Sequence, residues 1–423
     1  MHIEVVTIGD ELLLGYTIDT NAAHLARTLA AEGVEISRRT TVGDTAEAIA
    51  TGVREALDRA GAVITTGGLG PTSDDLTKPS IAALFGRGMV LDEEHLEWMR
   101  ERFRTLFQRP MPEANRQQAM LPEGARKLQN NHGSAPGIWL EDDRGRWVAM
   151  LPGVPREMRG MLADTLVPLI RERLGAERRV VRSRTLRTTG VGESFIADRV
   201  GTLEGGVGDV GLSYLPNAEG TDLRITVRNA LPEDADQRLA SAAERLRTIV
   251  GDVVYGEDGA DLAAVVLELC RARGLTIGVA ESCTGGLLGA RLTATAGSSD
   301  VVMGGVIAYA NAVKTSLLGV SAEALADEGA VSEPVVRAMA TGARTTTGAR
   351  AGLAITGIAG PGGGTEEKPV GTVWIATDLD GAVESRRLRL IGDRVEVRQR
   401  AAQSALEMLR RRILFGTSVV DLK

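Results

Sequence analysis

Strand-length apolar runs alternate with helix-length segments in the first part of the chain. The predicted strands cover residues 2–9, 34–43 and 62–68, and the predicted helices cover residues 20–33 and 45–61. A hairpin is predicted over residues 137–153, and a helix over 156–175 closes the segment. This alternation predicts a domain over residues 1–172 with a mostly parallel sheet and helices on both faces.

The rest of the chain shows two further patterns. Residues 176–254 carry strand patterns at 178–190, 209–217 and 221–230 and helix patterns at 192–203 and 232–252, which is typical of a small α+β module. From residue 258 the strand–helix alternation returns and continues to residue 418, ending in a hairpin over 371–390 and a helix over 393–414. We therefore predict two doubly wound α/β domains joined by a small α+β module.

Length and composition restrict the class of protein. A chain of 423 residues is longer than one hydrophobic core usually serves, so two or three domains are expected. The net charge of −7 argues against a general nucleic-acid or anionic-membrane surface, and aromatic residues, at 3%, are too few for base-stacking platforms. No signal-peptide pattern and no apolar run near membrane-spanning length is present, and the chain has two cysteines. We expect a cytoplasmic protein with no disulfide framework, no membrane partner and no nucleic-acid partner.

A candidate nucleophile lies in the last domain, where the sequence AESCTGG follows a predicted strand. All four histidines precede residue 133, so a serine or cysteine here needs another base within the domain. Lys314 and Tyr309 lie at a second strand-to-helix junction, and neighbouring strand ends of a parallel sheet meet in one crevice. A lysine in a dry cleft can lose its charge, so Ser282 with Lys314 matches the serine–lysine variant of nucleophilic catalysis.

Two glycine-rich stretches complete this predicted pocket. Gly285 and Gly286 are expected to allow close approach of a substrate and to offer N–H groups to an oxyanion. The loop at residues 356–371, which includes Gly360 and Gly362, suits the wrapping of a phosphate or ribose. Simpler interpretations remain open at this point: Ser282 as a helix cap, Cys283 as a small buried apolar residue, and Lys314 as a surface lysine.

The sequences AESCTGG, YANAVK, GAVSEPV and GIAGPGGGTEEKPVGTVW together resemble the C-terminal domain of the CinA family. The resemblance implies hydrolysis of the carboxamide of nicotinamide mononucleotide (NMN), without a cofactor, to nicotinic acid mononucleotide and ammonia. It implies a catalytic set of Ser282, Tyr309 and Lys314, in which Ser282 attacks the amide carbon and water then releases the acyl group. We add Thr284 and Asn311 as expected pocket contacts and Arg394 as an expected phosphate contact.

The first domain carries a second candidate site at its strand ends. Gly67, Gly68 and Gly70 form a turn that suits backbone N–H donation to a phosphate. Carboxylates beside a phosphate favour Mg²⁺ or Mn²⁺, so we predict a divalent-metal site with the ligands Asp10, Glu11, Asp74 and Asp75. The simpler interpretation is that Asp74 and Asp75 cap a helix N-terminus.

These motifs, with EANRQQAMLPEGARKLQNNHGSAPG and LPGVPREM, resemble the molybdopterin-binding domain family, and more closely its branch at the N-terminus of CinA. The resemblance implies either binding of a pterin or nucleotide, or metal-dependent cleavage of ADP-ribose to AMP and ribose 5-phosphate. We expect Thr72 and Glu157 to join the three glycines in binding the substrate. The alternative to a bifunctional enzyme is a molybdopterin- or nucleotide-binding regulatory protein without pyrophosphatase activity.

The middle module is expected to be KH-like from the same resemblance. Its GGVG sequence at residues 205–208 matches a GxxG loop, but acidic residues flank it, so RNA binding is not expected. The expected partners are NMN, ADP-ribose and a second copy of the chain in a homodimer.

Overall fold

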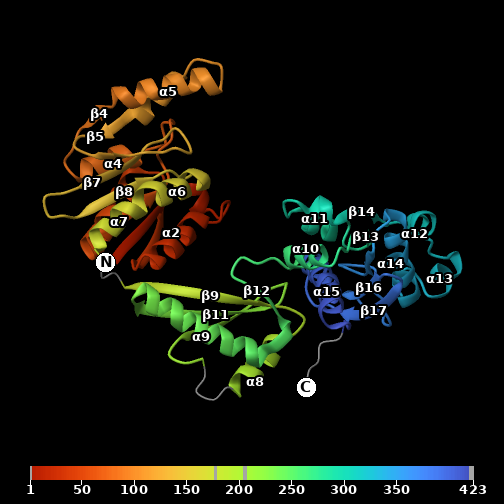
Figure 1. Cartoon of the computed structure of the whole chain (residues 1–423). Coiled ribbons are helices and arrows are strands. Elements are labelled where there is room, and N and C mark those ends of the chain that lie inside the picture. Colours follow the sequence, from red (N-terminus) through yellow and green to blue (C-terminus); the bar gives the residue numbers. More distant parts are fainter. Residues whose placement is uncertain (1, 176–178, 203–206, 419–423) are drawn as a thin grey trace. The chain divides into compact units, whose positions relative to one another are not determined.

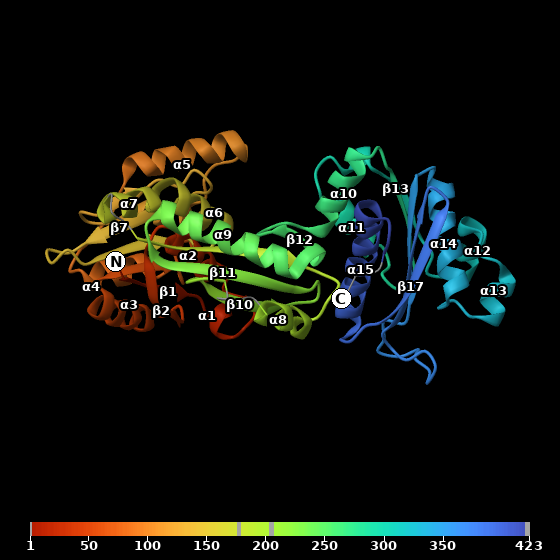
Figure 2. The ribbon, with the colours of Figure 1, turned by 60° about the horizontal axis from the view of Figure 1, so that its bottom comes forward.

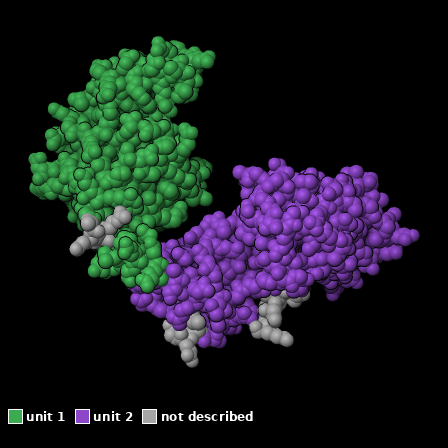
Figure 3. Space-filling model, in the orientation of Figure 1, with its two compact units in different colours: residues 1–182, 227–237 green, residues 183–226, 238–423 purple. Residues whose placement is uncertain are grey.

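The computed structural model describes residues 2–175, 179–202 and 207–418, and the chain divides into two compact units (Figure 3). The first unit contains residues 1–182 and 227–237, and the second contains residues 183–226 and 238–423. The predicted middle module is therefore divided, because strand β11 (Thr221–Ala230) and helix α9 (Pro232–Val250) have residues in both units.

The first unit is built on a six-stranded sheet in the order β2-β1-β3-β8-β7-β6. Figure 1 labels β7 and β8 of this sheet, beside α6 and α7. Its strands are β1 (His2–Ile8), β2 (Glu35–Val42), β3 (Ala62–Thr66), β6 (Arg126–Leu128), β7 (Gly137–Glu141) and β8 (Trp147–Leu151). β1 pairs in parallel with β2 and β3, and β3 pairs in parallel with β8. β7 and β6 add an antiparallel edge, as the predicted hairpin requires.

Alternating side chains of β1 enter two separate cores. Ile3 and Val5 pack with α2 (Thr20–Ala31), α6 (Pro155–Met161) and α7 (Val167–Leu174), and a short π-helix over Leu162–Leu166 links the last two. Val6 and Ile8 pack with α3 (Ala46–Ala60) and α4 (Thr77–Leu84) on the other face. Because successive strand residues point to opposite faces, a run of consecutive apolar residues identifies a strand buried on both sides.

A small subdomain lies outside these two layers. It contains the antiparallel pair β4 (Met89–Leu91) and β5 (Met120–Pro122), helix α5 (Glu93–Leu106) and a 3₁₀ helix over Glu113–Ala119. Leu96 and Met99 of α5 pack on Ala119. The short helix α1 (Asp10–Leu13) follows β1 directly, where the N-terminal candidate site begins.

Two further sheets follow along the described part of the chain, and the first of them has residues in both units. The strands β10 (Gly211–Pro216), β11, β9 (Val180–Thr188) and β12 (Val254–Glu257) form the first in that order, beside α8 (Glu193–Gly201) and α9. The second has the order β14-β13-β15-β16-β17, with β14 (Val302–Ile307), β13 (Ile277–Glu281), β15 (Ala351–Gly357), β16 (Thr372–Leu379) and β17 (Ala382–Arg389). β13 is parallel to both of its neighbours, and β16 and β17 form the predicted antiparallel hairpin.

Helices cover both faces of this five-stranded sheet (Figure 2). One face packs against α10 (Leu262–Ala272), α11 (Leu287–Thr293) and α15 (Arg394–Phe415), and the other against α12 (Asn311–Leu318), α13 (Ala322–Asp327) and α14 (Glu333–Thr347). The mixed α/β fold class predicted from the sequence is confirmed.

Helix α15 also joins the predicted middle module to the last domain. Gln403 donates a hydrogen bond to Thr189 at 3.2 Å, and Arg411 pairs with Asp252 at 2.8 Å. These buried polar contacts explain why most of the middle module belongs to the second unit. In the described part of the chain, no helix is both long and apolar enough to cross a membrane.

The close packing of α14 on the sheet depends on two glycines in neighbouring strands. Gly278 of β13 and Gly352 of β15 are paired in register, and both lie beneath α14. A Cβ atom at Gly352 would lie 2.0 Å from the carbonyl oxygen of Ala340. This oxygen belongs to the backbone of α14, so it cannot rotate away as the end of a side chain could, and the clash would remain. The helix can therefore approach this closely only over glycine.

We expect the substitution Gly352→Ala to lower the free energy of unfolding of the second unit by about 1–3 kcal/mol, the usual cost of overpacking. Denaturant unfolding monitored by circular dichroism measures the change. Gly259→Ala is the matched control, because nothing lies within 4 Å of a Cβ atom there and its backbone has no positive φ. Equal stability of the two variants would contradict the packing argument.

Candidate active sites

Ser282 directly follows β13, at the end of the sheet where the parallel strands β14 and β15 also have their carboxyl ends. Its backbone N–H donates to the carbonyl oxygen of Ile355 at 2.9 Å, which fixes the turn. The helix that follows is capped from inside by the buried carboxylate of Glu281, which accepts from the N–H groups of Gly286, Leu288 and Gly289 at 3.0, 3.0 and 2.8 Å. Ser282 is therefore not the helix cap, and its hydroxyl is available for another partner.

That partner is Lys314 of α12, whose side chain is 1% exposed. Its Nζ donates to the Ser282 Oγ at 3.1 Å, to the carbonyl oxygen of Ala308 at 2.7 Å and to that of Tyr309 at 3.4 Å. Burial lowers the pKa of the Lys314 amine, because the charged form loses its hydration. A neutral amine keeps two N–H groups for the two carbonyls, which leaves its lone pair for the hydroxyl proton of Ser282. This arrangement would allow a nucleophile and its general base to act together.

The neighbouring thiol does not share this activation. Cys283 is 7% exposed, and burial raises the pKa of its thiol to about 12. Cys270, in the core of α10, is also buried, and its pKa is likewise raised to about 12. Since the thiolate is the reactive form of cysteine, neither residue is a nucleophile near neutral pH.

Tyr309, Arg394 and Gly360 come together from three different segments. The side chain of Tyr309 is 63% exposed, and its phenol oxygen accepts a hydrogen bond from Arg394 Nη2 at 3.1 Å. Arg394, the first residue of α15, also donates from Nη1 to the carbonyl oxygen of Gly360 at 2.7 Å. Tyr309 therefore contacts Lys314 through its backbone carbonyl oxygen, whereas its phenol oxygen contacts Arg394.

The predicted oxyanion donors require correction. The N–H of Gly285 donates to the carbonyl oxygen of Ser282 at 3.1 Å, and the N–H of Gly286 donates to Glu281, so both are already used. The predicted contact of Thr284 with substrate also fails, because this residue is fully buried. Asn311 and Gly362 are exposed, at the start of α12 and in the loop before β16.

Arg398 was missed by the sequence analysis. Its Nε and Nη2 both donate to the carbonyl oxygen of Thr284, at 3.2 and 2.7 Å. It lies four residues after Arg394, so the two guanidinium groups occupy one face of α15. The four-residue spacing from Arg394 was the signal in the sequence that could have identified Arg398. Together the two side chains place positive charge beside the Ser282 turn.

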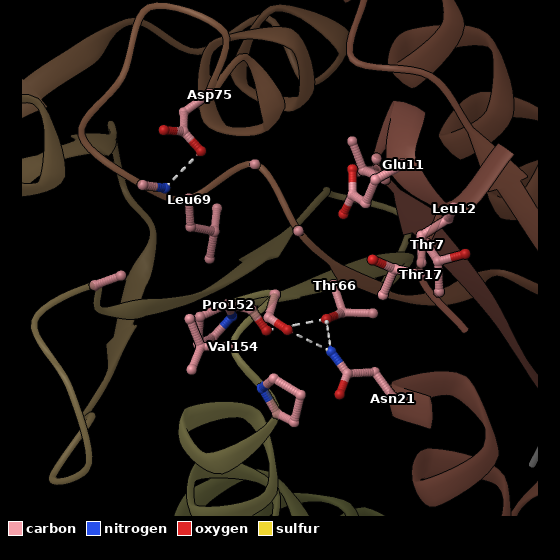
Figure 4. A pocket seen from close by; sticks show the side chains of 18 of the residues that line it. Thr7, Glu11, Leu12, Thr17, Asn21, Thr66, Leu69, Asp75, Pro152 and Val154 are labelled. Carbon is pink, nitrogen blue, oxygen red and sulfur yellow. Dashed lines mark hydrogen bonds between the residues drawn. The ribbon is translucent and has the colours of Figure 1, made fainter. Parts of the chain in front are cut away.

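The N-terminal candidate site is a pocket of about 480 Å³ at the carboxyl ends of β1, β3 and β8. Figure 4 shows its walls, with Glu11, Leu12 and Thr17 on one side and Pro152 and Val154 across from them. Asn21, which the sequence analysis did not select, donates to the Thr66 hydroxyl at 3.2 Å and to the carbonyl oxygen of Gly153 at 2.7 Å. These bonds join the start of α2 to the ends of β3 and β8.

The lining of this pocket is strongly acidic. It includes the predicted residues Gly67, Gly68, Gly70, Glu11, Asp74, Asp75 and Glu157. Asp19 and Asp44 add two carboxylates that the sequence analysis missed, and the described lining contains no lysine, arginine or histidine. An anionic ligand would therefore be repelled here unless a cation accompanied it.

Two of the predicted residues do not line the pocket. Asp10 is turned toward Asp44, whose N–H donates to its carboxylate at 3.3 Å. Thr72 donates from its hydroxyl to Asp75 at 2.5 Å. The carboxylate of Asp75 accepts further bonds from the N–H groups of Gly70 and Thr72, at 2.7 and 2.8 Å, so it stabilises the glycine turn.

The predicted set of four metal ligands is therefore not assembled. Within residues 2–175, 179–202 and 207–418, no three His, Cys, Asp or Glu side chains are grouped to hold a metal ion. Glu11 and Asp74 do line the pocket. One or two carboxylates suffice for Mg²⁺ when substrate phosphates supply the other ligands, so the residues fit an ion shared with a phosphate.

Part of the GGVG loop singled out in the middle module, residues 205 and 206, lies outside the described residues. The other two residues of the loop sequence, Val207 and Gly208, are described, and they precede β10.

Three family models match the chain in succession. Residues 4–172 match the "Probable molybdopterin binding domain", residues 183–256 the "Damage-inducible protein CinA KH domain", and residues 259–413 the "CinA C-terminal domain". The resemblance drawn from the sequence motifs is confirmed.

Relatives match over nearly the whole length. A "CinA-like protein" of Gemmatimonas aurantiaca is 62% identical over 411 residues, covering 97% of this chain and 96% of that protein. A "CinA-like protein" of Gloeobacter violaceus is 46% identical over 413 residues, with the same two coverages. The solved structure of a competence/damage inducible protein of Agrobacterium tumefaciens is 44% identical, covering 35% of this chain and 92% of that one, with a TM-score of 0.35.

Proposed function

This chain belongs to the CinA family, and on that basis we propose that its last domain hydrolyses the carboxamide of NMN to nicotinic acid mononucleotide and ammonia. The observation that carries the proposal is the distance of 3.1 Å between Ser282 Oγ and the buried Nζ of Lys314. A hydroxyl paired with an amine of lowered pKa suits attack on an unactivated amide, which water alone attacks very slowly.

The chemistry follows from this pair. Lys314, as a neutral amine, takes the hydroxyl proton while Ser282 Oγ bonds to the carboxamide carbon. The carbon–nitrogen bond then breaks, and the proton passes from Lys314 to the departing nitrogen, which leaves as ammonia. A water molecule attacks the resulting ester, Lys314 accepts its proton and returns it to Ser282, and the carboxylate product is released.

The phosphate of NMN has a candidate partner on α15. Arg394 is exposed at the first residue of this helix and is already held by Tyr309 and Gly360. A guanidinium at a helix N-terminus attracts an anion both by its own charge and through the helix dipole. In this proposal Tyr309 orients Arg394, and Arg398 holds the Ser282 turn through the carbonyl of Thr284.

The decisive experiment is a product assay on the purified full-length protein offered NMN alone. We expect stoichiometric ammonia and nicotinic acid mononucleotide in the presence of a metal chelator. Absence of both products, from protein shown to be folded by circular dichroism, would overturn the proposal.

A second activity is proposed for the first unit: metal-dependent hydrolysis of ADP-ribose to AMP and ribose 5-phosphate. The observation that favours it is the acidic pocket beside the Gly67–Gly70 turn, which suits a pyrophosphate only together with a cation. An ion held by Glu11 and Asp74 would neutralise the phosphate charge and polarise the phosphoryl oxygens. The alternative for this unit is binding of a molybdopterin or nucleotide in a regulatory role, without hydrolysis.

We expect chelation with EDTA to lower ADP-ribose hydrolysis by at least about 100-fold, and Mg²⁺ or Mn²⁺ to restore it. Ammonia release from NMN, measured in the same samples, should not change and serves as the internal control. Hydrolysis that persists in EDTA would contradict metal dependence, whereas binding of ADP-ribose without products at any metal concentration would favour the regulatory alternative.

A further inference from the structure

A closed ring of polar side chains joins the middle module to the last domain. Two of its members, Thr189 and Glu219, belong to the middle module, and the other two are Arg291 of α11 and Gln403 of α15. Thr189 directly follows β9, and Glu219 lies in the turn between β10 and β11. All four residues lie in the second unit, which Figure 3 shows in purple. The two proposed activities use none of them.

Each member of the ring contacts the next. The Thr189 hydroxyl donates to the carbonyl oxygen of Glu219 at 2.9 Å, and Glu219 Oε1 lies 3.3 Å from Arg291 Nη2. Arg291 Nη1 donates to Gln403 Oε1 at 2.9 Å, and Gln403 Nε2 donates to the Thr189 hydroxyl at 3.2 Å, which closes the ring. Thr189 and Gln403 are each 2% exposed, and the Arg291 side chain is 14% exposed. Water and salt therefore screen these contacts less than they screen ordinary surface ion pairs.

Glu219 is held in place from the side of the middle module. Its Oε2 accepts a hydrogen bond from Arg187 Nη2 at 3.0 Å. The next residue, Gly220, lies so close to β9 that a Cβ atom there would be 2.0 Å from the carbonyl oxygen of Thr188. The turn is therefore packed on β9, and it holds the Glu219 carboxylate toward Arg291.

The two helices that the ring joins both contribute to the Ser282 site. α11 begins directly after the Ser282 turn, and the N–H groups at its start are held by Glu281. α15 begins with Arg394 and carries Arg398, whose guanidinium donates to the carbonyl oxygen of Thr284. A displacement of α11 relative to α15 would therefore disturb the Ser282 turn.

We propose that the middle module supports the Ser282 site: through Glu219 it holds α11 against α15 and so positions the Ser282 hydroxyl for attack. Glu219 and Arg291 are positioning residues, because they act on Ser282 only through α11. A misplacement of about 1 Å at a reacting group can lower the rate by about 100-fold, so contacts remote from the chemistry can control kcat. The inference rests on the proposed amidase activity, and it gives the middle module a role in that activity.

Glu219→Gln and Arg291→Gln test the proposal in the full-length protein. Each substitution removes the charge attraction between the two residues. We expect kcat for ammonia release from NMN to fall about tenfold while KM stays within twofold, because the nucleophile is misplaced and the phosphate contact is kept. The double variant should be no slower than the slower single variant, because both changes remove the same interaction.

Glu257→Gln is the matched control. The Glu257 side chain is 28% exposed, against 30% for Glu219, and it pairs with Arg184 of β9 and Arg247 of α9. The substitution therefore removes comparable ion pairs within the middle module, and kcat should match that of the unmodified protein.

Hydrogen exchange followed by mass spectrometry gives a second measurement that does not depend on turnover. Peptides that cover α11 should exchange faster in Glu219→Gln, although the substitution lies in the middle module. The same peptides should exchange at the unmodified rate in Glu257→Gln.

The possible results separate this inference from the proposed amidase activity. If the unmodified protein releases no ammonia, the amidase proposal fails and exchange in α11 decides alone: faster exchange in Glu219→Gln supports the positioning role, and unchanged exchange overturns it. If ammonia is released and Glu219→Gln has the kcat of Glu257→Gln, the positioning role is overturned and the amidase proposal stands. An equal fall of kcat in both variants would indicate a general loss of stability and would also overturn it.

Discussion

Replacing Ser282 by alanine is expected to lower ammonia release from NMN by at least about 10³-fold. The substitution removes the Oγ atom that lies 3.1 Å from Lys314 Nζ, and no other hydroxyl or thiolate replaces it at that position. Loss of a catalytic nucleophile usually leaves only the catalysis that binding and electrostatics provide. A coupled assay for ammonia under saturating NMN measures the change in kcat.

Two controls accompany this experiment. Cys283→Ala removes the adjacent buried thiol and should leave kcat within a few-fold, because a thiol whose pKa is raised to about 12 is protonated at neutral pH. ADP-ribose hydrolysis by the Ser282→Ala protein should match that of the unmodified chain, since its pocket lies in the other unit. If Cys283→Ala abolishes ammonia release and Ser282→Ala does not, the assignment of the nucleophile is wrong.

Much of the fold could be predicted because burial leaves a direct mark on the sequence. β1 was identified from consecutive apolar residues, and the structure shows the cause: Val5 and Val6 enter different cores on opposite faces of the sheet. The division into two units could not be predicted in this way. It depends on side-chain contacts such as Gln403 with Thr189, which join residues more than 200 positions apart.

The Ser282–Lys314 contact could be predicted because the last domain has no histidine and few lysines, and both residues follow parallel strands. Sequence position, however, does not show where a backbone N–H points. Gly286 was expected to donate to an oxyanion, but the buried Glu281 occupies that N–H. A charged residue inside an apolar strand, just before a helix, was the signal that this cap existed.

The prediction of the metal-binding carboxylates in the first unit was wrong for a related reason. Asp74 and Asp75 are adjacent, but only the structure shows that Asp75 is used to stabilise the glycine turn. Asp44, which follows β2, lines the pocket in place of Asp10. Identical side chains at neighbouring positions of a loop point in different directions, and hydrophobic periodicity contains no information on their orientation.

The second large effect is expected at Lys314. Lys314→Met should lower kcat for ammonia release by at least about 10³-fold, because the methionine thioether cannot accept the proton of Ser282. Lys314→Arg should be equally impaired, since a guanidinium stays protonated and cannot act as a base. An Arg variant with substantial activity would show that Lys314 supplies only positive charge. Thermal unfolding checks that Lys314→Met is still folded: an apolar side chain of similar length fills the site where lysine is 1% exposed, but the carbonyl oxygens of Ala308 and Tyr309 lose a donor, so a lowered Tm is expected.

The pH dependence of the unmodified protein distinguishes a base from a structural lysine. Burial lowers the pKa of Lys314, and the neutral amine is the active form, so kcat/KM for NMN should rise with pH until that lowered pKa is passed. Below it, each unit of pH should reduce the active fraction about tenfold, and the plateau should begin below pH 10.5, the ordinary lysine pKa. The residual activity of Lys314→Met should lack this rise, because the titrating group is gone. A profile that keeps the same rise in Lys314→Met would assign the titration, and with it the role of the base, to a different group.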